Sequence, residues 1–330
     1  MATNASTEIK RTETAQIASL ATTKGLKGES NTQRSLRKLM RHRMALVGVG
    51  LLVFVVLYVL IGSFVFTEAQ ANYNDPAQAL QFPTSVHPMG TDEIGRDLLA
   101  RTIYGGQISL FIAVVAVAVE ILIGTLVGLI SGYFGGIPDA VLMRITEMML
   151  SIPQLFVTAI IVRVLTDPQR LKVMGMSSSF SFMGREFSIT MVLLIFIIGF
   201  TSWMRVARIV RATVLSLKEQ DFITAATSIG APRSRIVLRH ILPNCMGPVI
   251  VSATLGVANA ILLEAYLSFL GYGVRAPTAT WGSIMQEAGA HPQQWFYWLF
   301  PASLIMLTVL GINFFGDGIR DAFDPRSKAA

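Results

Sequence analysis

Six long, mainly apolar stretches limit the fold of this chain more than any other feature. The first covers residues 44–66 without a charge, and a helix rising about 1.5 Å per residue is then long enough to cross a hydrocarbon core of about 30 Å. The other stretches cover residues 108–131, 141–165, 188–204, 241–270 and 295–316. They are too long for the alternating strands of a membrane barrel. The sequence therefore predicts an all-α polytopic membrane protein with six transmembrane helices.

The basic residues predict the orientation of these helices. If the N-terminus is cytoplasmic, 20 of the 27 Lys and Arg residues lie on the cytoplasmic side, as the positive-inside rule requires. Both termini are then expected in the cytoplasm, with a six-helix domain over residues 44–316. We expect external segments near residues 67–107, 166–187 and 271–294, and a long cytoplasmic loop near residues 205–243.

Polar segments are expected at both ends of the chain. Residues 1–33 lack apolar periodicity and are typical of a disordered tail, and residues 317–330 form a short cytoplasmic tail. Residues 34–43 place leucine and methionine at helical spacing between basic residues. This pattern suits an interfacial helix on anionic head groups, and a plain charge cluster that fixes topology explains it equally well.

The loop of residues 205–243 has the pattern of a helix, a turn and a second short helix. Asp221 can cap the first helix, Gly230 permits a turn, and Pro232 suits the start of the next helix. Apolar residues recur near helical spacing at Phe222, Ile223, Ala226 and Ile229. Such an amphipathic helix is suited to a groove on a partner protein; the alternative is a solvated loop that only joins two spans.

The same loop resembles a known motif. Ala225-Ala226, three further residues, Gly230 and then Leu242-Pro243 resemble the EAA loop of ABC-type importer permeases, where the loop docks on the ATPase subunit. Thr224 stands where that motif usually has Glu, and His240 where it often has Ile. These departures remove a salt bridge from the Glu position and retain the small residues and the Gly hinge.

Further segments resemble the C-type permease subunit of dipeptide, oligopeptide and nickel importers, and the resemblance covers residues 35–326. The segment of residues 166–187 is longer than expected for that family. The segments that carry the resemblance are residues 87–101, 132–136, 269–273 with Pro277 and Trp281-Gly282, and 316–326.

The resemblance implies a type I ABC importer permease in a bacterial or archaeal cytoplasmic membrane. It implies a second permease, two ATPases that hold ATP and Mg, an external substrate-binding protein and a peptide as solute. On this basis, contacts with the ATPase are expected from Asp221, Phe222, Thr224, Ala225, Ala226, Gly230, Pro232, Arg239 and Pro243.

The chain itself carries no sequence sign of catalysis. A phosphate loop of the form G-x-x-x-x-G-K-[ST] is absent from the sequence, so ATP hydrolysis and its cofactors are expected in partner subunits. The lone Cys245 permits neither an internal disulfide nor a C-x-x-C metal site. Basic residues flank the spans instead of forming one stripe, which argues against nucleic-acid binding despite the net charge of +7.

Acidic residues within the spans are candidate functional groups, because an unpaired charge in a bilayer costs several kcal/mol. Glu120 is central in its span and is expected to line the solute path or to pair with the neighbouring permease. Glu264, near the outer end of its span, is a candidate for a substrate contact or gate. Glu147 and Arg144 are spaced for a local ion pair.

Two further groups of residues have competing interpretations. Asp92, Arg96, Asp97 and Trp281 are candidate contacts for the binding protein, or they stabilise the external segments locally. Gly124, Gly128 and Gly132 recur every four residues and allow close helix contact, which we interpret as packing in preference to a sliding surface.

Two other classes of protein remain as alternatives. An ion-driven secondary transporter would show internal symmetry of hydropathy and need no docking loop. An intramembrane enzyme would need a nucleophile and base or metal ligands within the spans, and the four His residues lie outside or at the edges of the spans. Systems of similar appearance also import nickel chelates or other solutes.

Overall fold

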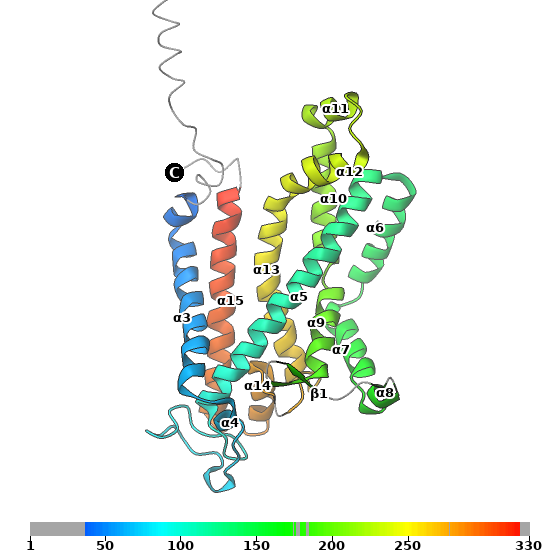
Figure 1. Ribbon diagram of the computed structural model, residues 1–330. Coiled ribbons are helices and arrows are strands. Elements are labelled where there is room, and N and C mark those ends of the chain that lie inside the picture. The colour runs from blue at the N-terminus through cyan, green and yellow to red at the C-terminus, as the bar shows by residue number, and fades with distance from the viewer. Residues whose placement is uncertain (1–36, 174, 176–178, 183–184, 277, 324–330) are drawn as a thin grey trace, which may run out of the picture.

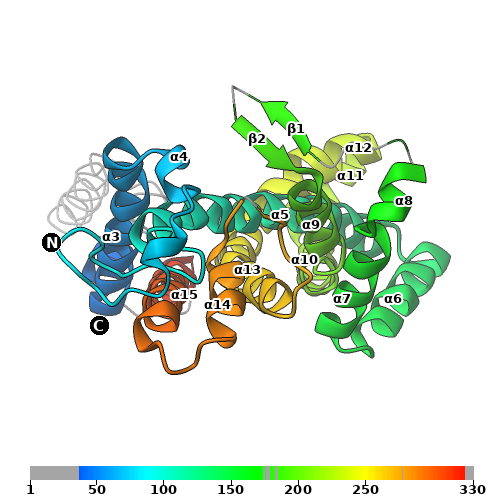
Figure 2. The same cartoon turned by 90° about the horizontal axis from the view of Figure 1, so that it is seen from below.

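A computed structural model describes residues 37–173, 175, 179–182, 185–276 and 278–323. The expected disordered tail of residues 1–33 therefore lies outside the described residues. Residues 324–330 of the expected C-terminal tail do so as well, whereas residues 317–323 are not a tail but continue the last helix. The described chain is an elongated helical bundle, with α3 (Arg43–Val65) and α15 (Trp295–Phe323) at one side and α6 (Gly136–Leu150) and α7 (Gln154–Leu165) at the other (Figure 2).

Five helical segments are long and apolar enough to cross a membrane. A sixth span is formed if α6 (Gly136–Leu150) and α7 (Gln154–Leu165), bent by 89° at Ser151 to Pro153, are taken as one broken span. The five segments are α3 (Arg43–Val65), α5 (Leu98–Phe134), α9 (Ile189–Phe200) with α10 (Met204–Lys218), α12 (Arg233–Arg235) with η3 (Ile236–Ile241) and α13 (Leu242–Phe269), and α15 (Trp295–Phe323).

Shorter elements gather at the two ends of the bundle. One end carries α11 (Asp221–Ser228), and we call it the α11 end; the start of α3 and the end of α15 lie there too (Figure 1). The opposite end, here the α14 end, carries α14 (Trp281–Gly289). It also holds α4 (Glu68–Ala71), η2 (Pro76–Gln78), α8 (Pro168–Val173) and the strands β1 (Ser179–Phe182) and β2 (Arg185–Ser188).

The structure differs from the all-α expectation at one place. In the polar segment of residues 166–187, β1 and β2 pair antiparallel, with Ser179 opposite Ser188 and Phe182 opposite Arg185. The pattern of apolar runs gave no sign of this hairpin, because its four-residue strands are far shorter than a membrane span.

Several helical segments also extend beyond the expected spans, two of them by ten residues or more. The second begins at Leu98, ten residues before the expected start, where the Asp97 side chain accepts a hydrogen bond of 2.8 Å from Ala100 N and caps the helix. The fourth continues through α10 into the expected loop of residues 205–243. It buries Val206, Val210 and Val214 on one face. Both extensions carry charges, so a search for uncharged runs ends too early.

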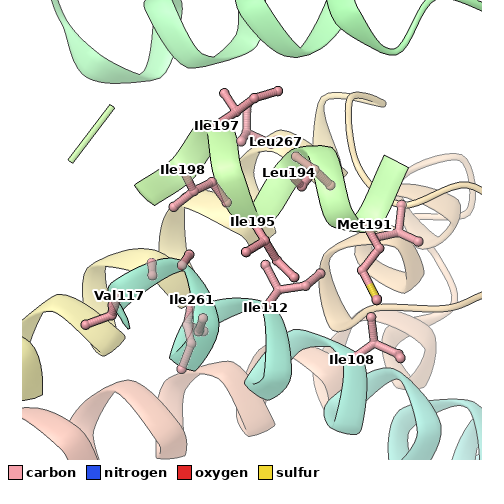
Figure 3. Packing of buried hydrophobic residues seen from close by; sticks show 14 of the residues in the cluster. Ile108, Ile112, Val117, Met191, Leu194, Ile195, Ile197, Ile198, Ile261 and Leu267 are labelled. Atoms are coloured by element: carbon pink, nitrogen blue, oxygen red, sulfur yellow. The ribbon is translucent and has the colours of Figure 1, made fainter. Parts of the chain in front are cut away.

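Helix α5 crosses the bundle diagonally from the α14 end, near α3, to the α11 end, near α6 (Figure 1). Its 37 residues span about 55 Å at 1.5 Å per residue, well beyond the thickness of a hydrocarbon core, so a tilt is required. Its middle packs against α9 and α13 in the main apolar core. Figure 3 shows Ile112 and Val117 of α5 near Ile195 of α9 and Ile261 of α13.

Glycines on α5 bring its backbone against α10. A Cβ atom added to Gly124, Gly128 or Gly132 would lie 2.6–2.8 Å from the Cβ of Val206, Val210 or Val214 respectively. Real Cβ atoms do not approach so closely, so only glycine fits at these three positions. The predicted role of these glycines in helix packing is thus confirmed.

We predict that Gly128→Val destabilises the protein by about 1–3 kcal/mol, because the new side chain overpacks the contact between α5 and α10. Denaturant unfolding in detergent measures the change. Gly50→Ala is the matched control, since an added Cβ there meets nothing within 4 Å. Equal stability of the two variants would contradict the assignment of a tight contact.

Candidate functional site: a projecting helix, a central cavity and an ion-pair cluster

Helix α11 follows α10 closely and packs one face against its own subunit. Ile223 and Ala226 are buried, and Ile223 shares an apolar cluster with Val214 of α10 and Ile236 of η3. The residue before the helix is Gln220, whose side chain makes no capping hydrogen bond. Asp221 is therefore the first residue of α11 and not its N-cap, which corrects the expectation; its carboxylate still lies where the helix dipole favours a negative charge.

The turn after α11 forms as the sequence predicts. Gly230 has a φ of +78°, Ala231 N donates to Ala226 O at 3.1 Å, and Gly230 N donates to Thr227 O at 2.9 Å. This pair of hydrogen bonds is the Schellman motif, which places glycine in the left-handed conformation. Pro232 follows directly and precedes α12.

The other face of α11 is exposed. Ile229, just after the helix, is 85% exposed, although an isoleucine is usually buried. Phe222 of α11 and Leu238 of η3 add large exposed apolar side chains at the same end. The remaining predicted docking residues Thr224, Ala225, Arg239 and Pro243 are exposed as well.

The chain widens into a π-helix directly before α13. Pro243 is the second residue of α13, and a proline ring there clashes with the carbonyl of Arg239 in regular α-helical geometry. The π-helical segment η3 ends at Ile241 and relieves that clash. Asn244 Nδ2 then donates to His240 O at 2.6 Å.

Polar contacts fix the turn between α5 and α6 to α10. Arg211 Nε and Nη2 donate to the two oxygens of Asp139 at 2.6 Å each. Lys218 Nζ donates to Tyr133 O at 2.8 Å. The pair of Asp139 and Arg211 was not predicted from the sequence, because 72 residues separate them and no local spacing relates them.

A cavity of about 460 Å³ lies between α5, α7, α10 and α13. Glu120, 8% exposed, contributes a carboxyl group, and Arg205 contributes a guanidinium group. Further polar side chains come from Gln154, Ser202, Ser252, Asn259 and Tyr266, and the rest of the lining is apolar. Arg205 and Asn259 were not singled out from the sequence. The chemistry of the cavity suits a polar solute with both charges.

Glu264 does not line this cavity. Its side chain is fully buried and accepts hydrogen bonds from Ser268 Oγ at 2.7 Å and Ser109 Oγ at 3.1 Å. These contacts join α13 to α5. The expectation that Glu264 contacts substrate is therefore wrong in this structure, because its oxygens face protein hydroxyl groups within the bundle.

The predicted external contacts Asp92, Arg96 and Trp281 are buried side chains and form no docking surface. Arg96 pairs with Asp92 and, at 3.0 Å, with Glu287 of α14. Trp281 Nε1 donates to Thr102 O at 2.9 Å. Asp97 caps α5 and lies 2.7 Å from His87 Nδ1. These residues hold the external segment together, so their expected contact with a binding protein is corrected for the side chains.

The centre of this ion-pair cluster is Glu287. Its carboxylate accepts hydrogen bonds from Arg96, from Arg101 Nη2 at 3.0 and 3.1 Å, and from Tyr297 at 3.1 Å. Arg101 is 2% exposed. The sequence places Glu287 in an external segment but indicates no role for Arg101. Within the described residues, no group of His, Cys, Asp and Glu has the arrangement of a metal site.

Comparisons with known proteins cover almost the whole chain. A family model described as "Binding-protein-dependent transport system inner membrane component" matches residues 124–329. A second, described as "N-terminal TM domain of oligopeptide transport permease C", matches residues 30–83.

Several curated proteins are similar over nearly their full length. The oligopeptide transport system permease protein OppC of Haemophilus influenzae is 37% identical, over 95% of this chain and 94% of its own. The dipeptide transport system permease protein DppC of Bacillus subtilis is 37% identical, over 91% of this chain and 87% of its own. OppC of Escherichia coli is 39% identical, over 92% of this chain and 94% of its own.

A solved structure shares the fold. A chain of the MetNI methionine ABC transporter, in inward-facing conformations, aligns with a TM-score of 0.51 and 20% sequence identity, over 67% of this chain and 94% of that chain. At this identity the likeness concerns the fold alone.

We predict that Glu287→Gln lowers the free energy of unfolding by about 3 kcal/mol, because it removes one of the two carboxylates, Glu287 and Asp92, that pair with the buried guanidinium groups of Arg96 and Arg101. Glu93→Gln is the control: Glu93 is partly exposed beside His291, and its loss changes stability by less than about 0.5 kcal/mol. Chemical denaturation of the purified protein measures both values. A similar small effect of both changes would show that Glu287 is not the anchor.

Proposed function

The chain belongs to the family of inner-membrane components of binding-protein-dependent transport systems, and from this premise we propose that it forms half of the solute pathway of an ATP-driven peptide importer. The observation that carries the proposal is the exposed apolar face of α11, which is joined through α10 to the wall of the central cavity. Relatives named as oligopeptide and dipeptide permeases support peptides as the solute.

The proposed assembly contains a second permease, two ATPase subunits that bind ATP and Mg, and an external substrate-binding protein. The α11 end then faces the cytoplasm together with both chain termini, and the α14 end faces outward. The excess of Lys and Arg in the segments at the α11 end supports this orientation. The bacterial relatives support a location in a bacterial cytoplasmic membrane.

Coupling in this proposal runs through rigid contacts. Only Glu219 and Gln220 separate α11 from α10, and α10 is fixed to the turn between α5 and α6 by Arg211 and Lys218. When the ATPases move α11, α10 moves with it and shifts Arg205 in the cavity wall. ATP drives transport because it binds the two conformations of the assembly with different affinities.

We predict that Ile229→Asp abolishes co-purification of the ATPase subunits from native membranes. The side chain is 85% exposed and the change leaves the fold intact, but it places a charge in the apolar docking face. Ile137→Asp is the matched control, since Ile137 is also an exposed isoleucine, at 79%, and lies in the first turn of α6 at the same end. Mass spectrometry of the purified complexes identifies the subunits.

Two results of this experiment would contradict the proposal. If the wild-type chain purifies alone or only with copies of itself, it is not a permease of a heteromeric importer. If both variants retain their ATPases equally, α11 is not the docking element. A separate uptake experiment distinguishes this proposal from an ion-driven carrier. An ATP-driven importer continues uptake in the presence of an ionophore and stops when ATP is depleted.

We predict that Glu120→Gln lowers peptide uptake by roughly tenfold, equivalent to about 1.4 kcal/mol, without loss of assembly. The change removes the carboxylate of the cavity while keeping the size of the side chain. Glu147→Gln is the control, because Glu147 pairs with Arg144 at 3.8 Å, is largely exposed and lies outside the cavity. Uptake of a radiolabelled peptide into proteoliposomes measures the rate. Normal uptake by Glu120→Gln would exclude the residue from the path.

A further inference from the structure

A second polar cavity, of about 210 Å³, lies at the α14 end of the molecule. It is formed where the end of α13, the following loop and α14 meet the first turns of α5. Two arginines, Arg101 and Arg275, and one carboxylate, Glu287, contribute the charged groups of its lining. Ser268, Ser283 and Gln286 add hydroxyl and amide groups. The cavity is distinct from the central one, with which it shares no lining residue.

The buried guanidinium group of Arg101 is only partly used. Its Nη2 atom donates to both oxygens of Glu287. Its Nε and Nη1 atoms are buried, and neither finds a hydrogen-bond partner among the described residues. Leaving buried donors of a charged group unsatisfied is unfavourable. Both atoms have almost no surface that solvent can reach, so a group in the cavity is attracted by the positive charge of Arg101 and does not bond to these two atoms.

The neighbouring carboxylates already accept several hydrogen bonds. Glu287 accepts from Arg96, Arg101 and Tyr297. Asp92 accepts from the backbone N–H groups of residues 94 and 96 and from the Arg96 side chain. Its Oδ2 atom lies 3.4 Å from Arg101 Nε, an ion pair without a hydrogen bond. A carboxylate has about four acceptor positions, so little capacity remains for Arg101 Nη1.

Arg275 places a second guanidinium group at this cavity. Arg275 is exposed, and its Nη2 atom donates to the backbone oxygen of Thr166 at 2.9 Å. The lining groups thus carry two positive charges and one negative charge. This balance favours an anion with a single charge, and the planar guanidinium groups are suited to a carboxylate.

We propose that this cavity binds the carboxylate group of a small solute that arrives from the α14 end. The volume of about 210 Å³ equals about seven waters at about 30 Å³ each, which is enough for a carboxylate with a short stem. The terminal carboxylate of a peptide is the source that fits the transported solute. That assignment of the source rests on the proposed function, whereas the carboxylate site itself does not.

The test measures acetate binding to the purified assembly in nanodiscs, without the external binding protein, by saturation-transfer NMR at constant ionic strength. Arg275→Gln weakens acetate binding by about tenfold, the loss expected for one charge-assisted hydrogen bond. Arg163→Gln is the matched control: Arg163 is exposed and bonds Tyr272 at 3.2 Å, but does not line this cavity. Arg101→Gln is expected to abolish acetate binding if that variant folds. If the Arg101 variant does not fold, the Arg275→Gln variant still tests the site.

Equal acetate binding by wild type and Arg275→Gln, or no acetate binding by wild type, would overturn the site. Competition arms then identify the source of the carboxylate. Displacement of acetate by Gly-Gly, but not by Gly-Gly amide, supports a peptide terminus. Displacement by neither overturns the peptide source and leaves an acidic side chain of a docked protein as the carboxylate. Because no arm measures transport, a failure here is distinct from a failure of the importer proposal.

Discussion

The close contact between α5 and α10 is the constraint on which the other parts of the structure depend. Because Gly124, Gly128 and Gly132 carry no side chain, the valines of α10 reach the backbone of α5. This contact holds α10, which carries Arg205, against α5, which carries Glu120, and both residues line the central cavity. The ion pair of Asp139 and Arg211 holds α6 to the same helix α10, just beyond the last of these glycines.

The two ends of the molecule are stabilised in different ways. At the α14 end, charged residues from α5, α14 and the external segment share one buried cluster around Glu287. At the α11 end, apolar packing of Ile223 and Ile236 supports the short helix while its outer face stays exposed. The first end is thus tied together by ion pairs, whereas the second end keeps exposed apolar surface of the kind that marks an interaction site.

The sequence predicts the membrane spans well because an uncharged apolar run of about 20 residues is typical of a transmembrane helix and rare in soluble domains. It also predicts the turn at Gly230, since a single residue with a positive φ suffices to end a helix. The prediction from sequence fails for segments in which charged or ionisable residues are buried or helical. Leu98 to Gln107 and α10 are helical although charged, and Glu264 is buried and hydrogen-bonded within the bundle although it is ionisable. Arg101 and Glu287, 186 residues apart, form a pair that no local pattern reveals.

The short connections of α11 have a mechanical consequence. Two residues join it to α10, and four residues, Ile229 to Pro232, join it to α12. A two-residue joint extends by no more than about 7 Å, so it leaves little slack. A displacement of α11 must therefore move the two flanking helices together. A longer or more flexible connection on either side would reduce the movement that reaches them.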